Sequence, residues 1–291
     1  MTAGVWLVVV HYGDPDLTGR TLGAVDPAVP PARRVVVDNG AGWTDRGGAQ
    51  VVRSDRNLGF AGGANLGLAR AFAGGADSAW LLNNDAAPEP DALSMLVESA
   101  GDDPATIVGA IEVDPRDEDP QGPWVGRAPV LPRRLQGRVR SIGGPAGPVD
   151  FLSGFSLLIG RDAWERVGPM DETYFHYFED VDYSMRAVRA GVPLIIDRRV
   201  QIAHRRATAL GSGSEIETYY FFRNRILLAR RYRSGPGLWV WLTADPRHGV
   251  LPLFSRRKLV ARDWAWLRGA WLGTLDGLRG RTGRRRVRQD R

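Results

Sequence analysis

The stretch Ala79-Trp-Leu-Leu-Asn-Asn-Asp85 decides the fold, because it is an apolar run that ends in an acidic residue. Val-rich runs and helix-like segments alternate through the first hundred residues, at 5–10, 35–40, 51–52, 60–72 and 90–100. Strands spaced by helices predict a mostly parallel central sheet flanked by helices, which binds ligands at the carboxyl ends of its strands. Asp38 and Asp85 both stand at predicted strand ends. A turn or capping role would explain either one alone, but the pair favours a ligand cleft.

A second informative stretch is Phe175-His-Tyr-Phe-Glu-Asp-Val-Asp-Tyr-Ser-Met-Arg186, which carries three carboxylates at a predicted helix start. Apolar residues recur at helical spacing from Val181 onward, so the helix is expected to begin near Asp180. The amino end of a helix favours an ionised carboxylate, which is the form that a general base needs. Glu179 and Asp182 are neighbours that could take the same role, and helix capping alone also places acidic residues there.

The composition indicates an enzyme-like body followed by a basic tail. The chain has 291 residues, a net charge of +6 and no cysteine, which excludes disulfides and thiolate metal sites and suits a reducing cytoplasm. Residues 256–291 hold twelve Lys or Arg and three Asp, which leaves 27 basic and 30 acidic residues elsewhere from totals of 39 and 33. A slightly acidic body argues against a nucleic-acid-binding protein.

The region 234–291 differs from the rest in its Trp and Arg content. Six apolar residues recur every three or four positions and would share one helical face: Val260, Trp264, Leu267, Trp271, Leu275 and Leu278. A Trp-rich face with basic flanks suits an amphipathic helix on an anionic membrane surface. The alternative is a helix packed on the preceding domain. With neither a signal peptide nor a spanning helix expected, the protein is predicted to be cytoplasmic, peripheral on the inner face of the plasma membrane under the first interpretation.

Eight short blocks follow one another between about residues 4 and 230: Val8-Val-Val-His-Tyr12, Val35-Val-Val-Asp-Asn-Gly40, Asn57-Leu-Gly-Phe-Ala-Gly-Gly-Ala-Asn-Leu-Gly67, Leu81-Leu-Asn-Asn-Asp85, Ser153-Gly154, Val167-Gly-Pro-Met-Asp-Glu172, Phe178-Glu-Asp-Val-Asp182 and His204. Their order resembles that in family 2 glycosyltransferases of the GT-A fold, and the chain most closely resembles bacterial rhamnosyltransferase-like members. Two departures are visible. His11 replaces a common Thr or Ser, and the motif that ends at Asp85 has one carboxylate where many members have two.

The resemblance implies a GT-A catalytic domain over residues 1–233, with a nucleotide-binding half at about 1–100 and an acceptor and catalytic half at 101–233. The segment 234–291 would be a helical extension. The implied activity is inverting, metal-dependent transfer of a sugar, with rhamnose as one candidate, from a dTDP- or UDP-linked donor to a cell-envelope or lipid-linked glycan. Transfer to a small natural product, or a non-catalytic sugar-nucleotide or glycan-binding module, are the alternatives. A nucleotidyltransferase would need a Gly-rich basic loop after the first strand, which His11-Tyr-Gly-Asp-Pro15 does not provide.

The resemblance also assigns residues to roles. Asp180 would be the general base, Asp85 would bind Mg²⁺ or Mn²⁺ on the donor phosphates, and His204 would complete the metal shell. A helix cap and a structural histidine are the respective alternatives for Asp85 and His204. Asp38 would accept a hydrogen bond from a pyrimidine N3–H. The full donor-binding set implied is His11, Tyr12, Asp38, Asn57, Gly59, Asn65 and Asn84.

Three segments carry further expectations. Residues 114–148 read as a long excursion of the kind that forms lids or contacts acceptors. Residues 207–214 read as a mobile loop able to close over the donor. Arg223 and Arg225, within an aromatic-Arg-Asn segment, are expected to meet phosphate or an acidic acceptor, or else to form a solvated basic face.

Overall fold

A computed structural model gives the fold and describes residues 4–25, 28–44, 47–113, 146–204, 214–232 and 264–285. The chain divides into two compact units. One comprises Met1–Asp171 with Glu179–Arg206, and the other comprises Glu172–Phe178 with Ala207–Arg291. The domain boundary expected after residue 233, most of the excursion at 114–148 and nearly all of the loop at 207–214 lie outside the described residues.

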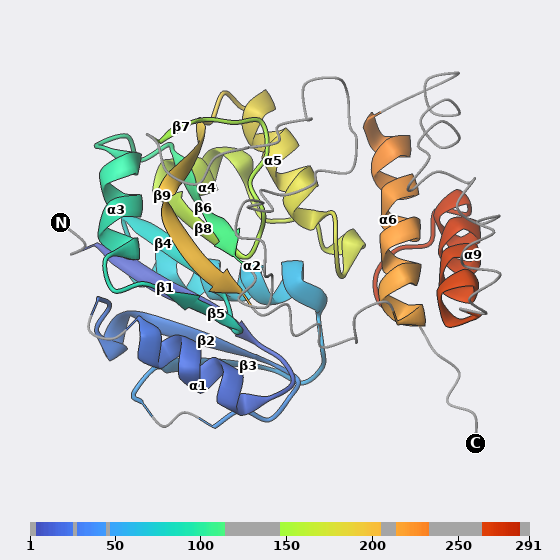
Figure 1. Cartoon of the computed structure of the whole chain (residues 1–291), viewed down its shortest axis with the longest axis horizontal. Coiled ribbons are helices and arrows are strands. Elements are labelled where there is room, and N and C mark those ends of the chain that lie inside the picture. The colour runs from blue at the N-terminus through green and yellow to red at the C-terminus, as the bar shows by residue number, and fades with distance from the viewer. Residues whose placement is uncertain are drawn as a thin grey trace. The chain divides into compact units, whose positions relative to one another are not determined.

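The first unit is built on a nine-stranded sheet with the order β3-β2-β1-β4-β8-β6-β9-β5, in which β7 pairs with β9 (Figure 1). The strands are β1 Val5–His11, β2 Arg34–Asn39, β3 Gln50–Ser54, β4 Ser78–Asn83, β5 Ala86–Pro88, β6 Ile107–Val113, β7 Gly147–Pro148, β8 Ser156–Gly160 and β9 Leu194–His204. The block β3-β2-β1-β4 is parallel. Strand β8 then runs antiparallel to β4 and β6, so the sheet as a whole is mixed.

Helices cover both faces of this sheet, and successive residues of β1 point into opposite cores. Leu7 and Val9 belong to one apolar core, with residues of α1 (Pro15–Ala24) and α3 (Ala92–Ala100). Val8 and Val10 belong to the other core, with α2 (Gly59–Ala73), α4 (Arg161–Val167) and α5 (Glu179–Arg189). Because both faces are buried, β1 is apolar at every position from Val5 to Val10 rather than alternating.

One predicted strand is shorter than expected. The sequence predicts a strand over residues 149–159, but β8 begins only at Ser156, and residues 151–155 form a loop. The backbone N–H of Gly154 donates to the carboxylate of Asp180 instead of to a neighbouring strand. An apolar run can therefore include loop residues when a side chain from another element satisfies their backbone groups.

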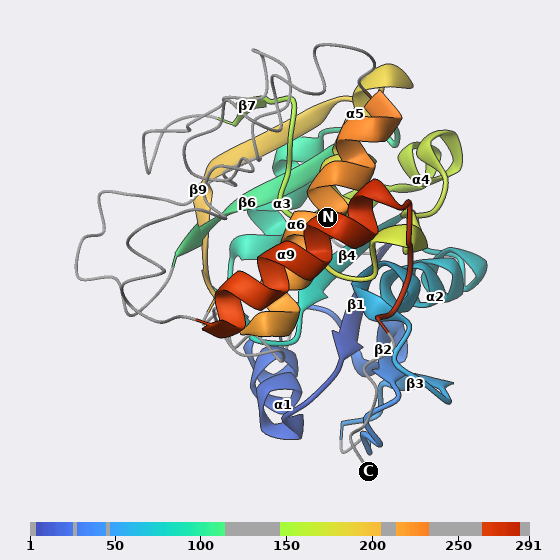
Figure 2. The ribbon, with the colours of Figure 1, turned by 90° about the vertical axis from the view of Figure 1, so that its right-hand side faces the viewer.

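The second unit contains the short 3-10 turn Glu172–Tyr174 and the helices α6 (Glu215–Tyr232) and α9 (Trp264–Leu278), which cross side by side (Figure 2). Three glycines of α9 face α6. A Cβ atom at Gly269 would lie 2.3 Å from the carbonyl oxygen of Glu215, and one at Gly273 would lie 2.3 Å from that of Tyr219. At Gly277 the corresponding distance to the Arg223 carbonyl oxygen is 2.8 Å. Only glycine permits this close approach of the two backbones.

The face of α9 predicted to be apolar points away from that contact. Trp264 is 64% exposed, Trp271 55% and Leu278 45%. Seven-residue spacing places these three side chains on nearly the same side of the helix. The helix thus packs within its unit through glycines while its Trp face stays in solvent. Among the helices of the described residues, none is both long and apolar enough to cross a bilayer.

Candidate active site

Strand pairing brings Asp85 and His204 together in the first unit. Asp85 follows β4 and directly precedes Ala86, which pairs with His204 at the end of β9. The Nε2 atom of His204 lies 2.9 Å from Oδ1 of Asp85 and 3.2 Å from Nδ2 of Asn83. Phe155 stacks on the imidazole at 5.4 Å between ring centroids. The two residues that the sequence proposed as metal ligands are therefore in direct contact.

Glu112 of β6 occupies the other side of the imidazole and was not anticipated from the sequence. Its Oε1 atom lies 2.7 Å from Nδ1 of His204. Burial lowers the pKa of His204, but the hydrogen bonds and charges of Asp85 and Glu112 outweigh burial and raise this pKa to about 9. A signal for Glu112 was present, because it is the one charged residue in the apolar strand Ile107–Val113, and a buried carboxylate needs a partner.

The donor atoms around His204 fit a small divalent cation. A carboxylate oxygen of Asp85 and an imidazole nitrogen converge there, and the nearby Oδ1 of Asn83 is buried without a hydrogen-bond partner. Oxygen and imidazole donors suit Mg²⁺ and Mn²⁺. No cluster of three or more His, Cys, Asp or Glu side chains suited to a metal occurs in the described ranges, since Glu112 sits on the far nitrogen of the ring. The remaining ligands would have to come from phosphate and water.

Asp180 stands in the first turn of α5, as predicted, and retains some solvent exposure. Its Oδ2 atom accepts from the backbone N–H of Gly154 at 3.1 Å, and its Oδ1 atom accepts from that of Val181 at 2.8 Å. Burial raises the pKa of Asp180, these backbone donors oppose that effect, and the charge of Glu112 adds to it, with a net rise. A raised pKa makes the carboxylate a stronger base.

The neighbouring carboxylates are in different surroundings. Glu179 is buried and its Oε2 atom has no hydrogen-bond partner. Burial, and then the charge of Asp180, raise the pKa of Glu179 to about 8, so this side chain is mostly neutral at pH 7. Asp182 is fully buried and pairs with Nε of Arg186 at 2.8 Å. Of the three carboxylates, Asp180 alone is not fully buried, so it alone can meet an acceptor hydroxyl.

The loop before β8 links the base candidate to the metal candidates. Gly154 binds the carboxylate of Asp180, and the next residue, Phe155, stacks on His204. The carbonyl oxygen of Phe155 also accepts from the backbone N–H of Asn83 at 2.8 Å. Two consecutive loop residues therefore contact both halves of the candidate site.

The residues assigned to donor binding at the end of β1 form hydrogen bonds with neighbouring residues of the same unit. His11 is buried and its Nδ1 atom lies 2.7 Å from Oγ1 of Thr18, while burial lowers the pKa of its imidazole. The amide of Asn84 contacts the carbonyl oxygen of Tyr12 at 3.4 Å and Oγ1 of Thr18 at 3.3 Å. These contacts bring the ends of β1 and β4 together. Contact of His11, Tyr12 and Asn84 with a sugar donor stays a prediction.

Asp38, at the end of β2, has its carboxylate partly engaged. Its Oδ1 atom accepts from the backbone N–H groups of Ala41 at 2.9 Å and Gly42 at 3.0 Å, which is the turn role considered as the alternative. Its Oδ2 atom lies 4.0 Å from Nη1 of Arg53. This second oxygen is the one that would meet a pyrimidine N3–H.

Two glycines of the small-residue segment in α2 pack directly against β1. A Cβ atom at Gly63 would lie 2.5 Å from Val10, and one at Gly67 would lie 2.3 Å from Val8. Asn65 uses both ends of its amide on the backbone of Met170, at 2.9 and 2.8 Å. Gly63 and Gly67 therefore allow close contact between the helix and the sheet. Asn57 and Gly59 are joined at the start of the helix by a 2.8 Å hydrogen bond, and their donor role remains a prediction.

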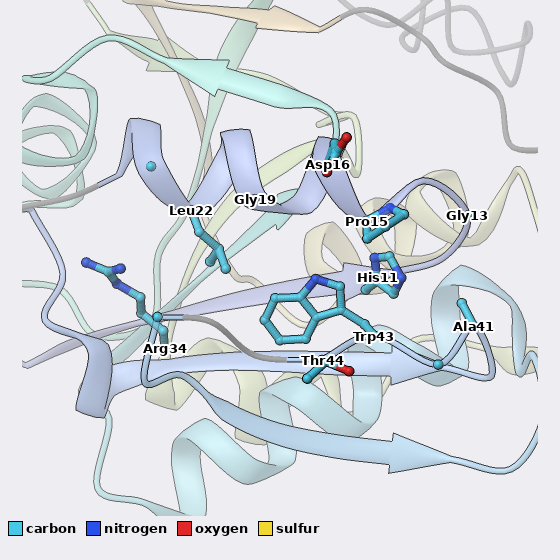
Figure 3. A pocket seen from close by; sticks show the side chains of 13 residues that line it. His11, Gly13, Pro15, Asp16, Gly19, Leu22, Arg34, Ala41, Trp43 and Thr44 are labelled. Carbon is cyan, nitrogen blue, oxygen red and sulfur yellow. The ribbon is translucent and has the colours of Figure 1, made fainter.

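A cavity of about 440 Å³ lies between α1 and the segment after β2 (Figure 3). Its lining includes His11, Pro15, Arg34 and Trp43. Of the expected donor-binding residues only His11 lines it, and none of the proposed catalytic or metal-binding residues does. The cavity is therefore not lined by the carboxylates that the sequence assigns to catalysis or metal binding.

In the second unit, Arg223 and Asn224 of α6 are buried and bind backbone rather than solvent. The amide nitrogen of Asn224 donates to the carbonyl oxygens of Tyr174, His176 and Tyr177 at 2.6, 2.7 and 2.9 Å. Arg223 donates to the carbonyl oxygen of Tyr174 at 3.0 Å. The solvated basic face considered for this segment is wrong, because its arginines are buried.

A mixed sheet covered by helices on both faces, with an acidic residue after β4 and a carboxylate at the start of α5, agrees with the GT-A fold that the sequence predicts. The sequence profile described as "Glycosyltransferase like family 2" matches residues 5–214. The chain belongs to glycosyltransferase family 2.

Similar proteins include two rhamnosyltransferases and one uncharacterized protein. N-acetylglucosaminyl-diphospho-decaprenol L-rhamnosyltransferase of Mycobacterium tuberculosis is 26% identical over 267 residues, covering 77% of this chain and 86% of its own. The dTDP-rhamnosyl transferase RfbF of Shigella flexneri is 24% identical, covering 97% of this chain and 98% of its own. Rv1525 of M. tuberculosis, an uncharacterized protein, is 29% identical over 178 residues. The match covers 58% of this chain and 62% of the length of Rv1525.

Among solved structures, the mannosyltransferase PcManGT from Pyrobaculum calidifontis, in complex with GDP-Man and Mn²⁺, superposes with a TM-score of 0.55 at 14% identity. The superposition covers 94% of this chain and 87% of that one. At this identity the likeness concerns the fold alone, and it agrees with the GT-A architecture expected from the sequence.

Proposed function

We propose that this glycosyltransferase transfers a sugar with inversion from a dTDP- or UDP-linked donor to a hydroxyl of a cell-envelope or lipid-linked glycan, with the aid of Mg²⁺ or Mn²⁺. The observation that carries the proposal is the loop at Gly154 and Phe155, which contacts Asp180 with one residue and His204 with the next. It couples a partly exposed base candidate to the pair of residues suited to a cation.

In the proposed reaction, the acceptor hydroxyl gives its proton to Asp180 as its oxygen attacks the anomeric carbon of the donor. The bond from that carbon to the diphosphate oxygen breaks on the opposite face, so the nucleoside diphosphate leaves and the configuration inverts. One base and one displacement suffice for this outcome. A divalent cation, when bound, neutralises the charge that develops on the departing diphosphate.

The residues of the chain divide these tasks. Asp85 and the Nε2 atom of His204 would hold the cation, and Oδ2 of Asp38 would accept from the pyrimidine N3–H. Gly154 fixes the orientation of the Asp180 carboxylate, so the base needs no rearrangement before proton transfer. The names of the rhamnosyltransferase relatives favour rhamnose as the sugar and a polyprenyl-diphosphate-linked saccharide as the acceptor.

We also propose that the protein works at the cytoplasmic surface of the membrane, because a lipid-linked acceptor lies there and α9 presents Trp264 and Trp271 to solvent. Exposed arginines flank these side chains on α9 and just beyond it, among them Arg268 and Arg279. Amphipathic aromatic and cationic groups favour an anionic lipid surface.

The test is a donor panel with the full chain. dTDP-rhamnose, UDP-galactose, UDP-N-acetylglucosamine and GDP-mannose are each offered with a polyprenyl-diphosphate N-acetylglucosamine acceptor, with Mn²⁺ or with EDTA. We expect turnover with a dTDP- or UDP-linked sugar, loss of turnover in EDTA and recovery with Mn²⁺ or Mg²⁺. Asp85→Ala should lower turnover by orders of magnitude without unfolding the chain. Full activity in EDTA, or turnover with GDP-mannose alone, contradicts the proposal.

A further inference from the structure

Glu112 is a buried acidic side chain in the middle of the sheet, and neither the proposed reaction nor the sequence motifs give it a role. It is 6% exposed, on the apolar strand β6. Burying a carboxylate is costly unless it is paired or hydrogen-bonded, and its Oε1 atom finds Nδ1 of His204 at 2.7 Å. An apolar residue would serve a purely structural strand at lower cost.

The pairing of the strands explains this contact. In the parallel pair β6–β9, Glu112 stands opposite Ile202, so His204 follows two residues further along the same side of β9. On its other edge β9 pairs with β5, where Ala86 stands opposite His204 and carries Asp85 next to it. The register between β6 and β9 shifts after Ala110. Such irregularities re-aim side chains next to functional sites.

His204 therefore has a separate partner on each ring nitrogen. Glu112 meets Nδ1, and Asp85 meets Nε2 at 2.9 Å. Phe155 stacks on the flat face of the ring. A ring held at one nitrogen and one face can present the other nitrogen in a single direction.

We propose that Glu112 is a positioning residue that accepts a hydrogen bond from Nδ1–H of His204, so that Nε2, beside Asp85, is the ring nitrogen that binds the divalent cation in place of its proton. This inference rests on the metal site of the proposed function. A metal-bound histidine commonly gives its second ring N–H to a carboxylate, which fixes the tautomer and the orientation of the ring, and loss of that partner typically weakens metal binding about 10–100-fold.

The experiment measures Mn²⁺ binding by the full chain without turnover, by calorimetry and by the electron paramagnetic resonance signal of free Mn²⁺, with and without saturating UDP. Glu112→Ala should weaken Mn²⁺ binding about 10–100-fold. Glu112→Gln keeps an acceptor oxygen for Nδ1–H and should weaken it much less. This rescue by Gln is not expected if the charge of Glu112 matters only for folding.

Asp197→Ala is the matched control. Asp197, on β9, is a buried carboxylate like Glu112, but it binds Arg199 and Ser99 instead of His204. Its loss should lower the thermal stability of the protein and leave the Mn²⁺ dissociation constant of the folded fraction unchanged. The two substitutions separate weakened metal binding from general destabilisation.

The wild-type protein offers a second readout should Glu112→Ala fail to fold. The chain has four histidines, so the ring nitrogens of His204 can be assigned by long-range ¹H–¹⁵N correlation in the presence of Mg²⁺. We expect a proton on Nδ1 and none on Nε2. The opposite tautomer, or unchanged Mn²⁺ binding in Glu112→Ala together with lost binding in Asp85→Ala, overturns the role of Glu112 alone. Unchanged binding in both Asp85→Ala and His204→Ala overturns the metal site itself.

Discussion

The backbone N–H of Gly154 and the carboxylate of Asp180 are joined by a 3.1 Å hydrogen bond across 26 residues of sequence. The contact holds one carboxylate oxygen in place, and the N–H of Val181 holds the other. A side chain fixed in this way has one orientation available for proton transfer. Glu179, one residue earlier, is buried and has no comparable restraint on its Oε2 atom.

Asp180→Asn should abolish transfer while donor binding persists, because the amide keeps the size of the carboxylate but cannot accept a proton. General-base catalysis contributes about 10²–10⁴-fold, and we expect a fall in kcat of that order with a donor Kd close to wild type. Steady-state kinetics and calorimetry with the donor measure the two quantities. Glu179→Gln is the matched control and should retain most of the activity. If Glu179→Gln is the more damaging change, the base is Glu179.

Glu179 should make stability depend on pH. Its folded-state pKa is raised to about 8 from an ordinary value of 4.5, so between these values the unfolded chain releases the proton and the folded protein keeps it. The free energy of unfolding should thus fall as pH rises from about 4.5 to about 8 and then level off. Glu179→Gln removes this contribution. Urea unfolding at pH 5, 6.5 and 8 measures the free energy of unfolding, which should decline less with pH in Glu179→Gln than in the wild type. An equal decline in both proteins would refute the raised pKa of Glu179.

Asp182 should matter for stability rather than for catalysis. Its ion pair with Arg186 is fully buried on the carboxylate side, and Asp182→Ala leaves the guanidinium without that partner at a cost of about 1–3 kcal/mol. The exposed pair of Asp162 and Arg166 provides the control, since Asp162→Ala should cost no more than about 1 kcal/mol. Urea unfolding measures both. A large loss of kcat in a fully folded Asp182→Ala protein would instead place Asp182 in the chemistry.

The exposed Trp face of α9 should bind anionic liposomes. Replacement of both Trp264 and Trp271 by Ala should reduce co-sedimentation with phosphatidylglycerol vesicles without lowering stability, because both side chains are in solvent. Trp266 packs edge-on against Phe222 at 5.6 Å, so Trp266→Ala should lower stability and spare liposome binding. Binding of the wild-type chain should weaken at 1 M salt, where the Debye length is about 3 Å. Indifference of the wild-type chain to vesicles would contradict the membrane proposal.

The core of the fold was readable from the sequence because its signals are local. The apolar runs from Val5, Val35 and Ala79, and the helix that starts beside Asp180, depend on side-chain periodicity, which short segments carry by themselves. Those elements appear where the sequence predicts them. The pattern also indicated the contact of Asp85 with His204, through the family resemblance.

Other features depend on contacts between distant segments, which periodicity does not report. The pairing of β6 with β9 decides that Glu112 meets His204, and the two residues are 92 positions apart. The contacts of Gly63 with Val10 and of Gly67 with Val8 likewise follow from the fold and not from any local pattern. Arg223 carries a charge that suggests solvent or phosphate, yet its hydrogen bonds go to backbone carbonyls and to the side chain of Asn224.

The three hydrogen bonds from Asn224 to the segment 174–177 have a consequence for the order of synthesis. Phe175, Tyr177 and Phe178 have φ values of 60, 67 and 75°, a left-handed conformation that non-glycine residues hold only when their surroundings impose it. The residue that imposes it is translated about fifty positions later. On the ribosome, the segment that runs directly into Glu179 and Asp180 gains these hydrogen bonds only after α6 has emerged, so we expect its left-handed conformation to form late in synthesis.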